Sequence, residues 1–314
     1  MAMLRAMRAR LFAAFAAVYL VWGSTYLFIR FAVETLPPLL MASARHLIAG
    51  VILLLWARFR QGAGLPSRRD WITGLVSGTL LLVGGNGAVV WAEQRVPSGI
   101  AALIVAIVPL WMVLLDWWRP RGRRPAALVF VGLALGLAGL ALLIGPDAFR
   151  GGGTIDVAAA VVLIAGSLSW AIGSLYTKSA PKPSNSNHGS GAQMVAGGAC
   201  LVVLALALGE GSQLDLGHAS TRSLLSLVYL ILVGSLIGFT AYIYLLAHTT
   251  AAKAATYAYV NPVVAVLLGW AFAGEPVTTR TLVAAAVILA GVAIITVARD
   301  SSVPVSSESR RAAA

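Results

Sequence analysis

The feature that most constrains this chain is a succession of ten apolar runs, each long enough to cross a lipid bilayer as a helix. A crossing helix needs about 17–25 predominantly apolar residues. The runs lack the alternation of apolar and polar residues that marks membrane β-barrels. They cover residues 11–29, 38–56, 71–92, 99–118, 126–144, 157–176, 191–208, 224–247, 254–273 and 281–298. The sequence therefore predicts an all-α membrane protein with ten transmembrane helices.

The composition excludes an ordinary soluble domain. Of the 314 residues, 59% are hydrophobic and 11% are charged, whereas a soluble domain has about 25% charged residues. The net charge of +12 could suggest a nucleic-acid partner. The basic residues, however, lie in short clusters between the apolar runs and need no partner beyond anionic lipid head groups. We therefore expect a lipid bilayer, and no nucleic acid, around this chain.

The positions of Lys and Arg predict the orientation of the chain, because these residues gather on the cytoplasmic side of membrane proteins. If the N-terminus lies inside, the inner segments hold Arg5, Arg8, Arg10, Arg58, Arg60, Arg68, Arg69, Arg119, Arg121, Arg123, Arg124, Lys178, Lys182, Lys253, Arg299, Arg310 and Arg311, and the outer loops hold only Arg95, Arg150, Arg222 and Arg280. We expect a multi-pass protein of the cell (inner) membrane with both termini in the cytoplasm. The first run is long for a signal peptide and is expected to be retained.

The two halves of the chain resemble each other. The segment LVWGSTYLFIR at residues 20–30 matches LSWAIGSLYTK at residues 168–178. The aligned pairs include Trp22 and Trp170, Arg30 and Lys178, Arg45 and Gln193, and Pro109 and Pro262. Five helices in each half would place the halves in opposite orientations, because five is odd. We therefore predict two inverted repeats, over residues 11–144 and 157–298, with the symmetry that underlies alternating access.

A proline lies deep in one helix of each half. Pro109 and Pro262 have no backbone N–H, which frees the carbonyl groups of Val105 and Ala258 and predicts a kink in each helix. In lipid, a freed carbonyl group needs a partner in protein or water. We expect both helices to face a cavity and the two prolines to act as hinges. Asn261, directly before Pro262, would add a polar side chain there.

Polar groups inside membrane helices are expensive and often functional. Arg45 could contact an anion or carboxylate, with His46 as a possible proton-coupling site; alternatively, Arg45 could extend its side chain to the membrane interface. In the segment Gly84–Gly87, Asn86 could bind a polar group of a substrate, or the glycines could allow close helix packing. Both pairs of interpretations stay open at this point.

Aromatic and acidic residues give further candidates. Tyr242 and Tyr244 point about 200° apart around a helix, so at most one of them lines a site, and the same holds for Tyr257 and Tyr259. The aligned tryptophans of the two halves are better candidates. Three carboxylates, at Glu93, Asp116 and Glu275, fall near predicted helix ends, where water is accessible. We expect Glu275 to terminate a helix and Asp116 to pair with a basic residue such as Arg119.

Other patterns point to structure rather than chemistry. Small residues, including Gly132, Gly136, Gly139 and Gly291, mark the fifth and tenth helices and predict close packing, with a homodimer contact as one possibility. The sequence contains none of the nucleotide-binding, zinc-protease or nucleophile-elbow motifs. Its four histidines and single cysteine are scattered without metal-ligand spacing. We therefore expect neither a metal nor a cofactor.

Five segments together form a combination known from one group of transporters. They are Trp22–Tyr26, Gly85–Gly87, Val96–Ala102, Ser167–Trp170 and Tyr257–Gly269. The combination resembles the EamA-domain members of the drug/metabolite transporter superfamily, from about Leu11 to Ala298. This resemblance implies ten helices in two EamA repeats around a central cavity, and export of amino acids, other metabolites or toxic compounds. The polar loop 178–190 is longer than this resemblance implies, and the segment Asp116–Arg119 departs from its counterpart at the end of the ninth helix.

These observations lead to one functional hypothesis: an integral membrane transporter that moves a small organic solute by alternating access. Export is favoured over import by the resemblance alone, and proton coupling stays open. Together with what the resemblance implies for the cavity, the candidate substrate-binding residues are Trp22, Asn86, Trp170, Tyr242, Tyr259 and Asn261, of which Tyr242 and Tyr259 are implied by the resemblance alone. The candidate hinges are Pro109 and Pro262, and Arg45 and His46 are candidates for coupling. The alternative is a membrane-embedded enzyme acting on lipids or isoprenoids, which would need a cluster of Asp, His or a nucleophile at one membrane face. A membrane scaffold would leave the buried Asn, Arg and Pro unexplained.

Overall fold

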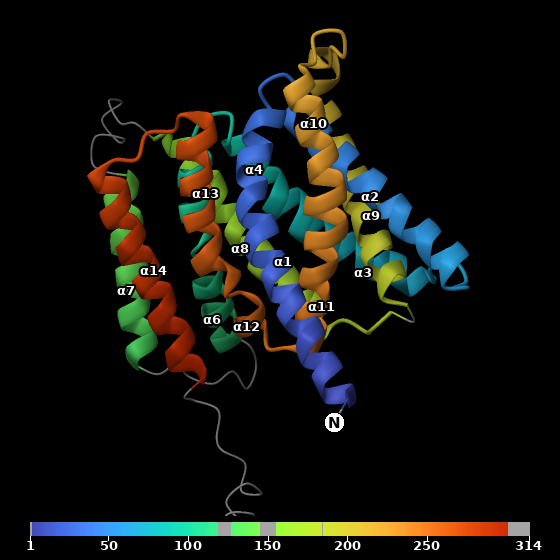
Figure 1. Ribbon diagram of the computed structural model, residues 1–314, viewed down its shortest axis with the longest axis horizontal. Helices are drawn as coiled ribbons and strands as arrows, with labels where there is room; N and C mark the ends of the chain where they lie inside the picture. Colours follow the sequence, from blue (N-terminus) through green and yellow to red (C-terminus); the bar gives the residue numbers. More distant parts are fainter. Residues whose placement is uncertain (1, 119–126, 145–154, 184, 301–314) are drawn as a thin grey trace, which may run out of the picture.

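The computed structural model describes residues 2–118, 127–144, 155–183 and 185–300, and within these ranges every regular element is a helix. Figure 1 shows the helices packed side by side as a bundle, with most axes roughly along the vertical direction of that view. The elements are α1 (Ala2–Ala32), α2 (Pro38–Arg60), α3 (Arg68–Gly78), η1 (Thr79–Gly87), α4 (Ala88–Ala92), α5 (Ser98–Val105), α6 (Val108–Trp118), α7 (Ala127–Ile144), α8 (Val157–Ser179), α9 (Ser186–Ala207), η3 (Glu210–Gln213), α10 (Thr221–Tyr229), η4 (Leu230–Phe239), α11 (Thr240–His248), α12 (Ala251–Ala254), α13 (Tyr257–Ala273) and α14 (Thr279–Asp300).

Seven helical stretches of the described chain are long and apolar enough to cross a membrane. They are Met7–Ala32, Pro38–Arg60, Arg68–Ala92, Ser98–Trp118, Val157–Ser179, Ser186–Ala207 and Thr221–His248. Three shorter apolar helices, Ala127–Leu143, Val260–Ala273 and Thr279–Ile294, fall on the remaining predicted runs. The protein is thus an all-helical, multi-pass membrane protein, whereas ten full crossings and their inversion stay predictions.

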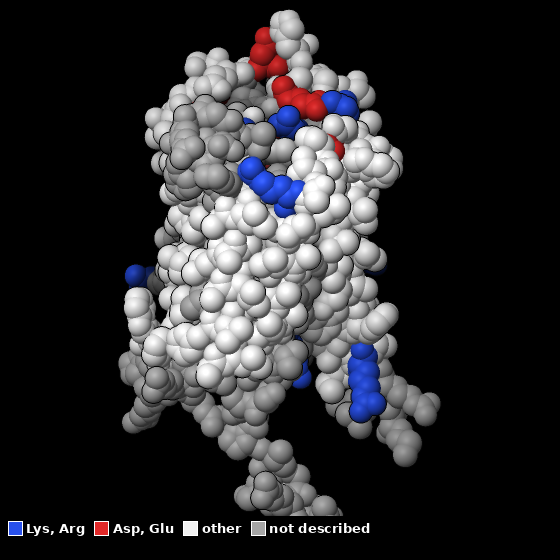
Figure 2. All heavy atoms as spheres, turned by 90° about the vertical axis from the view of Figure 1, so that its left-hand side faces the viewer, with Lys and Arg blue, Asp and Glu red and all other residues white. Residues whose placement is uncertain are grey.

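We call the end of the bundle where α1 ends and α10 begins the upper end, as drawn in Figure 1, and the opposite end the lower end. On the face drawn in Figure 2, a mostly uncharged band separates these ends. The acidic residues visible on this face lie at the upper end, above the band. Such a band is what a helix bundle presents to the hydrocarbon core of a bilayer.

Glycines allow several helices to approach closely. A Cβ atom at Gly78 of α3 would lie 2.5 Å from the carbonyl oxygen of Gln193 in α9. A Cβ atom at Gly291 of α14 would lie 2.6 Å from the carbonyl oxygen of Gly132 in α7. The predicted close packing of the fifth and tenth helices is therefore confirmed, and it occurs between these two helices within one chain.

Two glutamates of the second half of the chain cap the N-termini of helices in the first half. Glu210, after α9, accepts hydrogen bonds from the backbone N–H groups of Leu39 (3.2 Å) and Leu40 (2.9 Å) at the start of α2. Glu275, after α13, accepts from Ser98 (2.7 Å) and Gly99 (3.2 Å) at the start of α5. A negative charge stabilises a helix N-terminus, whose first N–H groups lack partners in the helix. The helix α13 itself ends at Gly274, whose positive φ of 64° forms a left-handed C-cap.

Two interruptions lie near the predicted hinges. The helix breaks at residues 106–107, directly before α6, as expected from the lost backbone N–H at Pro109. Pro262, in contrast, lies inside α13, and the break falls at residues 255–256, just before Ala258 and less than one turn from it. There the N–H of Ala258 donates to the carbonyl of Ala255 (3.1 Å), a tight turn that replaces a helical bond. The kink is therefore displaced from its predicted position.

A third kind of interruption was not predicted. The segments η1 and η4 are π-helical, and each lies in the middle of the third long helical stretch of its half of the chain. Isolated π-helical turns inside α-helices frequently occur at functional sites. Both segments contribute side chains to the cavity described next.

Candidate functional site

A cavity lies in the middle of the bundle and has about 650 Å³ of space free of protein atoms, the open space connected to it included. Its walls come from α1, α2, η1, α4, α5, α8, η4 and α13. Six predicted site residues line it: Trp22, Asn86, Trp170, Asn261, Arg45 and His46. Residues that are up to 239 positions apart in the sequence thus meet around one chamber. Neither Pro109 nor Pro262 is part of the lining; both are buried beside it in their helices.

Arg45 is buried, with only 3% of its surface exposed, so its side chain does not extend to the membrane interface. Its Nε donates a hydrogen bond to Ser235 Oγ of η4 (2.7 Å). Its Nη1 has no hydrogen-bond partner among the described residues. A buried guanidinium with an unused donor is costly unless something else binds it. This position excludes extension of the Arg45 side chain to the membrane interface, and contact with an anionic or carboxylate group stays a prediction.

His46, Asn86 and Asn261 add polar atoms to the cavity wall. His46 Nε2 lies 3.2 Å from Asn86 Oδ1. Within the described part of the chain, His46 Nδ1 and Asn261 Oδ1 have no hydrogen-bond partner. The cavity therefore offers a cationic donor at Arg45 and a carbonyl acceptor at Asn261, on walls that are otherwise mainly apolar and aromatic.

The glycines beside Asn86 serve packing. A Cβ atom at Gly85 would lie 2.7 Å from the Trp170 ring, and one at Gly84 would lie 2.1 Å from Ser169 Oγ, both in α8. The packing interpretation is therefore confirmed for these glycines. Asn86 lines the cavity, and its contact with a substrate stays a prediction. The approach of α8 brings Trp170 into the cavity wall.

Four aromatic rings form a cluster at the lower side of the cavity: Trp22, Trp170, Tyr242 and Tyr257. The ring of Trp22 lies 5.4 Å from Trp170, 4.9 Å from Tyr242 and 5.4 Å from Tyr257, measured between centroids. The Tyr242 hydroxyl accepts a hydrogen bond from Trp170 Nε1 (3.2 Å) and lies 2.6 Å from Ser174 Oγ. Tyr242 is fully buried and does not line the cavity. It supports the cavity from behind rather than facing it.

The tyrosine pairs separate as the helical angle requires. Tyr244 stacks on His248, with 4.0 Å between ring centroids, away from the cluster that contains Tyr242. Of the second pair, Tyr257 lines the cavity, whereas the sequence analysis selected Tyr259, whose side chain lies outside the described residues. Thr25, Tyr26 and Ser167 also line the cavity and were not predicted. Their spacing of three or four residues from the aligned tryptophans was a usable signal, since such residues share a helix face.

The position of Glu93 differs from the one predicted. Its place near a helix end predicted access to water, but its side chain is 0% exposed. Neither of its carboxylate oxygens has a hydrogen-bond partner in the described ranges. Near this position α2 and α8 pack against α4, and Arg30 of α1 binds the Glu93 backbone. No local pattern in the sequence reports these contacts. The partner expected for Asp116, Arg119, lies outside the described residues.

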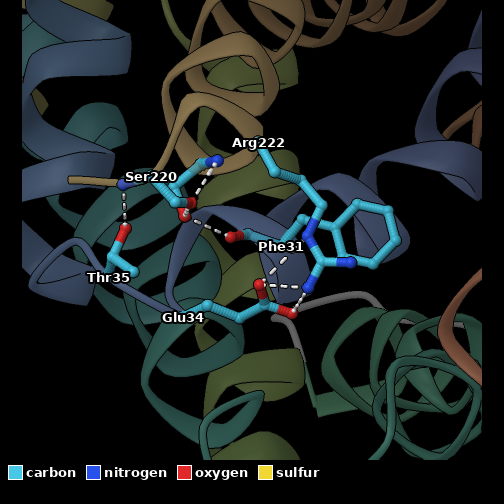
Figure 3. Close-up of polar contacts among 6 residues, drawn as sticks. Phe31, Glu34, Thr35, Ser220 and Arg222 are labelled. Carbon is cyan, nitrogen blue, oxygen red and sulfur yellow. Dashed lines mark hydrogen bonds and ion pairs between the residues drawn. The ribbon is translucent and has the colours of Figure 1, made fainter.

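Above the cavity, α1 and α10 are joined by a set of contacts that we call the upper latch: Phe31, Glu34, Thr35, Ser220, Arg222 and Ser223. Figure 3 labels the first five of these residues. Arg222 forms an ion pair with Glu34, and its guanidinium lies 4.4 Å from the centroid of the Phe31 ring. Ser223 Oγ donates to the Phe31 carbonyl (2.7 Å), and the Ser220 N–H donates to Thr35 Oγ1 (3.1 Å). The upper latch therefore holds together two helices from opposite halves of the chain.

Closer to the cavity, the same two helices stay in contact. Phe28 and Tyr229 stack at 3.8 Å between ring centroids, and Ser24 Oγ lies 2.7 Å from the Tyr229 hydroxyl. At the lower end, a second hollow of about 1310 Å³ is lined by residues that include Lys178 of α8 and Leu246 of α11. Along α8 and α11, the aromatic cluster lies between this hollow and the cavity. The contacts between α1 and α10 thus lie above the cavity, and the aromatic cluster lies below it.

Two segments of the chain, residues 9–145 and 157–297, match the EamA-like transporter family. The chain therefore belongs to this family and is an integral membrane transporter, as its resemblance to EamA-domain proteins predicted.

Among its relatives is YedA of Escherichia coli K12, an inner membrane transporter that is 40% identical over 292 residues, covering 92% of this chain and 91% of YedA. The probable terminal-alkyne amino-acid exporter of Streptantibioticus cattleyicolor is 27% identical over 274 residues, covering 87% of this chain and 89% of that protein. A solved crystal structure shares the fold, with a TM-score of 0.64 at 20% identity, over 93% of this chain and 99% of the other. Neither the family nor these relatives support a lipid-modifying enzyme.

Proposed function

We propose that the protein exports a small organic solute, with amino acids as the first class to test, by alternating access around the central cavity. The observation that carries this proposal is a pair of polar atoms in the cavity wall, Arg45 Nη1 and Asn261 Oδ1, that have no hydrogen-bond partner among the described residues. A solute that carries both an acidic group and a donor group would satisfy both atoms and remove their desolvation cost. The name of the Streptantibioticus relative supports both the direction of transport and the solute class.

The residues of the site have different proposed roles. Trp22, Asn86, Trp170 and Asn261 contact the solute, and Arg45 binds its acidic group. Tyr242 holds the Trp170 ring through its hydroxyl, and Tyr259 remains a proposed contact. Pro109 and Pro262 are the proposed hinges, since each lies in a helix that is interrupted beside the cavity. His46 is a proposed coupling residue, and protons are the proposed coupling ion.

The architecture that we propose for this cycle has ten crossings in two inverted repeats, residues 11–144 and 157–298, in the cell (inner) membrane with both termini in the cytoplasm. Two paired features support it: the π-helical segments η1 and η4 occupy corresponding places in the two halves, and the aligned Trp22 and Trp170 meet at 5.4 Å. In this orientation the upper end faces the outside. A homodimer is a further proposed assembly, without a proposed contact.

The test is flux of radiolabelled amino acids and related metabolites into liposomes that contain the purified protein, with and without a proton gradient. We expect saturable uptake for at least one solute. Asn261→Ala should raise the KM about 2- to 10-fold, because one hydrogen bond contributes about 0.5–1.5 kcal/mol. Val263→Ala, two residues away on the exposed side of α13, is the matched control and should leave the KM unchanged.

Two outcomes contradict parts of this proposal. If no solute of the panel is transported under either condition, the proposed solute class is wrong. If a solute is transported equally by Asn261→Ala and by the unmodified protein, transport stands and the assignment of Asn261 to the site is wrong.

A further inference from the structure

Glu93 is a buried carboxyl group that the fold leaves without a hydrogen bond. It follows the end of α4, one turn beyond Val89, which lines the cavity. Glu210 and Glu275 each accept two backbone N–H bonds, whereas the carboxylate oxygens of Glu93 accept none from the described residues. An ionised carboxylate in such a place has lost its hydration without replacement, which costs several kcal/mol.

The charged and titratable groups that act on Glu93 come from three elements: Tyr26 and Arg30 of α1, Arg45 of α2, and Glu275 after α13. The two arginines favour an ionised Glu93, whereas Glu275 and the burial oppose it. Arg30 donates to the backbone carbonyl of Glu93 (2.7 Å) rather than to its carboxylate. None of the ion pairs found in the described ranges includes Glu93. The proton on this group is thus controlled by its surroundings and not by one fixed partner.

These surroundings depend on the position of α1. On one side, Arg30 contacts Glu93. Phe31, directly after Arg30, and Glu34, just beyond the end of α1, contact α10 through the upper latch. A displacement of α1 that opens the upper end therefore also displaces Arg30, which binds the Glu93 backbone, and Tyr26, which interacts electrostatically with Glu93. Water that enters there would hydrate the carboxylate and remove the cost of its ionised form.

We propose that Glu93 is a proton-binding site, protonated while the upper end is closed and ionised while it is open. On closing, a proton from water bonds to one carboxylate oxygen, and on opening it returns to water. This inference rests on the alternating access proposed above and assigns the proton step to Glu93 rather than to His46. With the upper end outside, the empty exporter closes with a proton taken from outside.

The test measures the opening of the upper end without any solute. Spin labels are attached at Leu216→Cys, before α10, and at Thr279→Cys, at the start of α14, after Cys200→Ser removes the native thiol. Both labelled positions are exposed. Pulsed electron paramagnetic resonance then gives the distribution of label distances in lipid nanodiscs between acidic and alkaline pH. We expect a population with longer distances that grows as the pH rises. Glu93→Gln, which cannot ionise, should show only the short distances at every pH.

Two variants keep this test specific. Glu93→Asp retains a titratable group and should retain the pH response. Glu34→Gln removes the carboxylate of the upper latch and leaves Glu93 in place. Glu34→Gln should therefore keep the opening at alkaline pH.

The proposal is overturned if the unmodified protein shows the same distances at every pH, or if Glu93→Gln responds to pH as the unmodified protein does. The first outcome is measured on the protein without a substitution at Glu93. It can therefore overturn the proposal even if Glu93→Gln folds poorly. Because no solute is present, a failed flux panel would leave this result unaffected, and a failed pH response would leave the solute class unaffected.

Discussion

The upper latch makes a quantitative prediction about the balance between closed and open forms of the upper end. Arg222 takes part in two interactions, the ion pair with Glu34 and the contact with the Phe31 ring at 4.4 Å. The side chains of the ion pair are 56% exposed at Arg222 and 33% exposed at Glu34. Such a partly exposed pair contributes about 0.5–1 kcal/mol, and the cation–π contact adds about 0.5–1 kcal/mol.

Two substitutions separate these contributions. Arg222→Met removes both interactions and should lower the ratio of closed to open forms by about 5- to 30-fold, which corresponds to about 1–2 kcal/mol. Glu34→Gln removes only the ion pair and should lower this ratio by about 2- to 5-fold. Raising the salt concentration from about 0.15 M to about 1 M shortens the screening length from about 8 Å to about 3 Å. High salt should therefore move the unmodified protein toward the Glu34→Gln variant and leave the Arg222→Met variant nearly unchanged.

The distances between spin labels at Leu216→Cys and Thr279→Cys provide the assay, at a single pH near neutrality. The control is Arg95→Met, which removes a different upper-end arginine whose partner is Asp156 and which lies outside the upper latch. Equal effects of Arg222→Met and Glu34→Gln would refute the role of the Phe31 contact. A closed-to-open ratio that neither substitution changes would refute the assignment of these residues as the closure of the upper end.

Two further predictions concern packing. Gly78→Leu should strongly lower the thermal stability in detergent, because its Cβ atom would lie 2.5 Å from the Gln193 carbonyl oxygen. The control Gly136→Ala should not, because no described atom lies within 4 Å of a Cβ atom at this position. Equal stability of both variants would contradict the observed packing of α3 on α9. Tyr242→Phe removes the hydroxyl that binds Ser174 and Trp170 and should lower the thermal stability, because each lost hydrogen bond costs about 1 kcal/mol. Tyr244→Phe is the control. A larger loss of stability in the control would contradict the supporting role of Tyr242.

The sequence was sufficient for the helical class, the family and six of the residues that line the cavity. The reason is physical: spanning length and apolar composition are local properties, and the aligned Trp22 and Trp170 are visible as a repeat. The direction of a side chain is less accessible, because it depends on where a helix is interrupted. The break at residues 255–256 and the π-helical segments change the helical register, and they have no sequence signal as clear as a proline.

Burial of single residues at helix ends was also beyond sequence reasoning. Glu93 and Glu275 both follow the end of a helix, yet one is sealed without a hydrogen bond and the other caps α5. The difference arises from contacts with elements that are distant in the sequence, such as Arg30 and Ser98. A pattern that considers one helix at a time contains no information about those partners.

The carboxylates that cap helices of the other half have a consequence for biosynthesis. The first half of the chain is made first, and it enters the membrane with the N-termini of α2 and α5 lacking the groups that complete them. Glu210 and Glu275 emerge from the ribosome only with the second half. Maturation of the early helices therefore waits for the late ones. A chain cut between its halves would leave α2 and α5 incomplete until the two fragments meet in the bilayer.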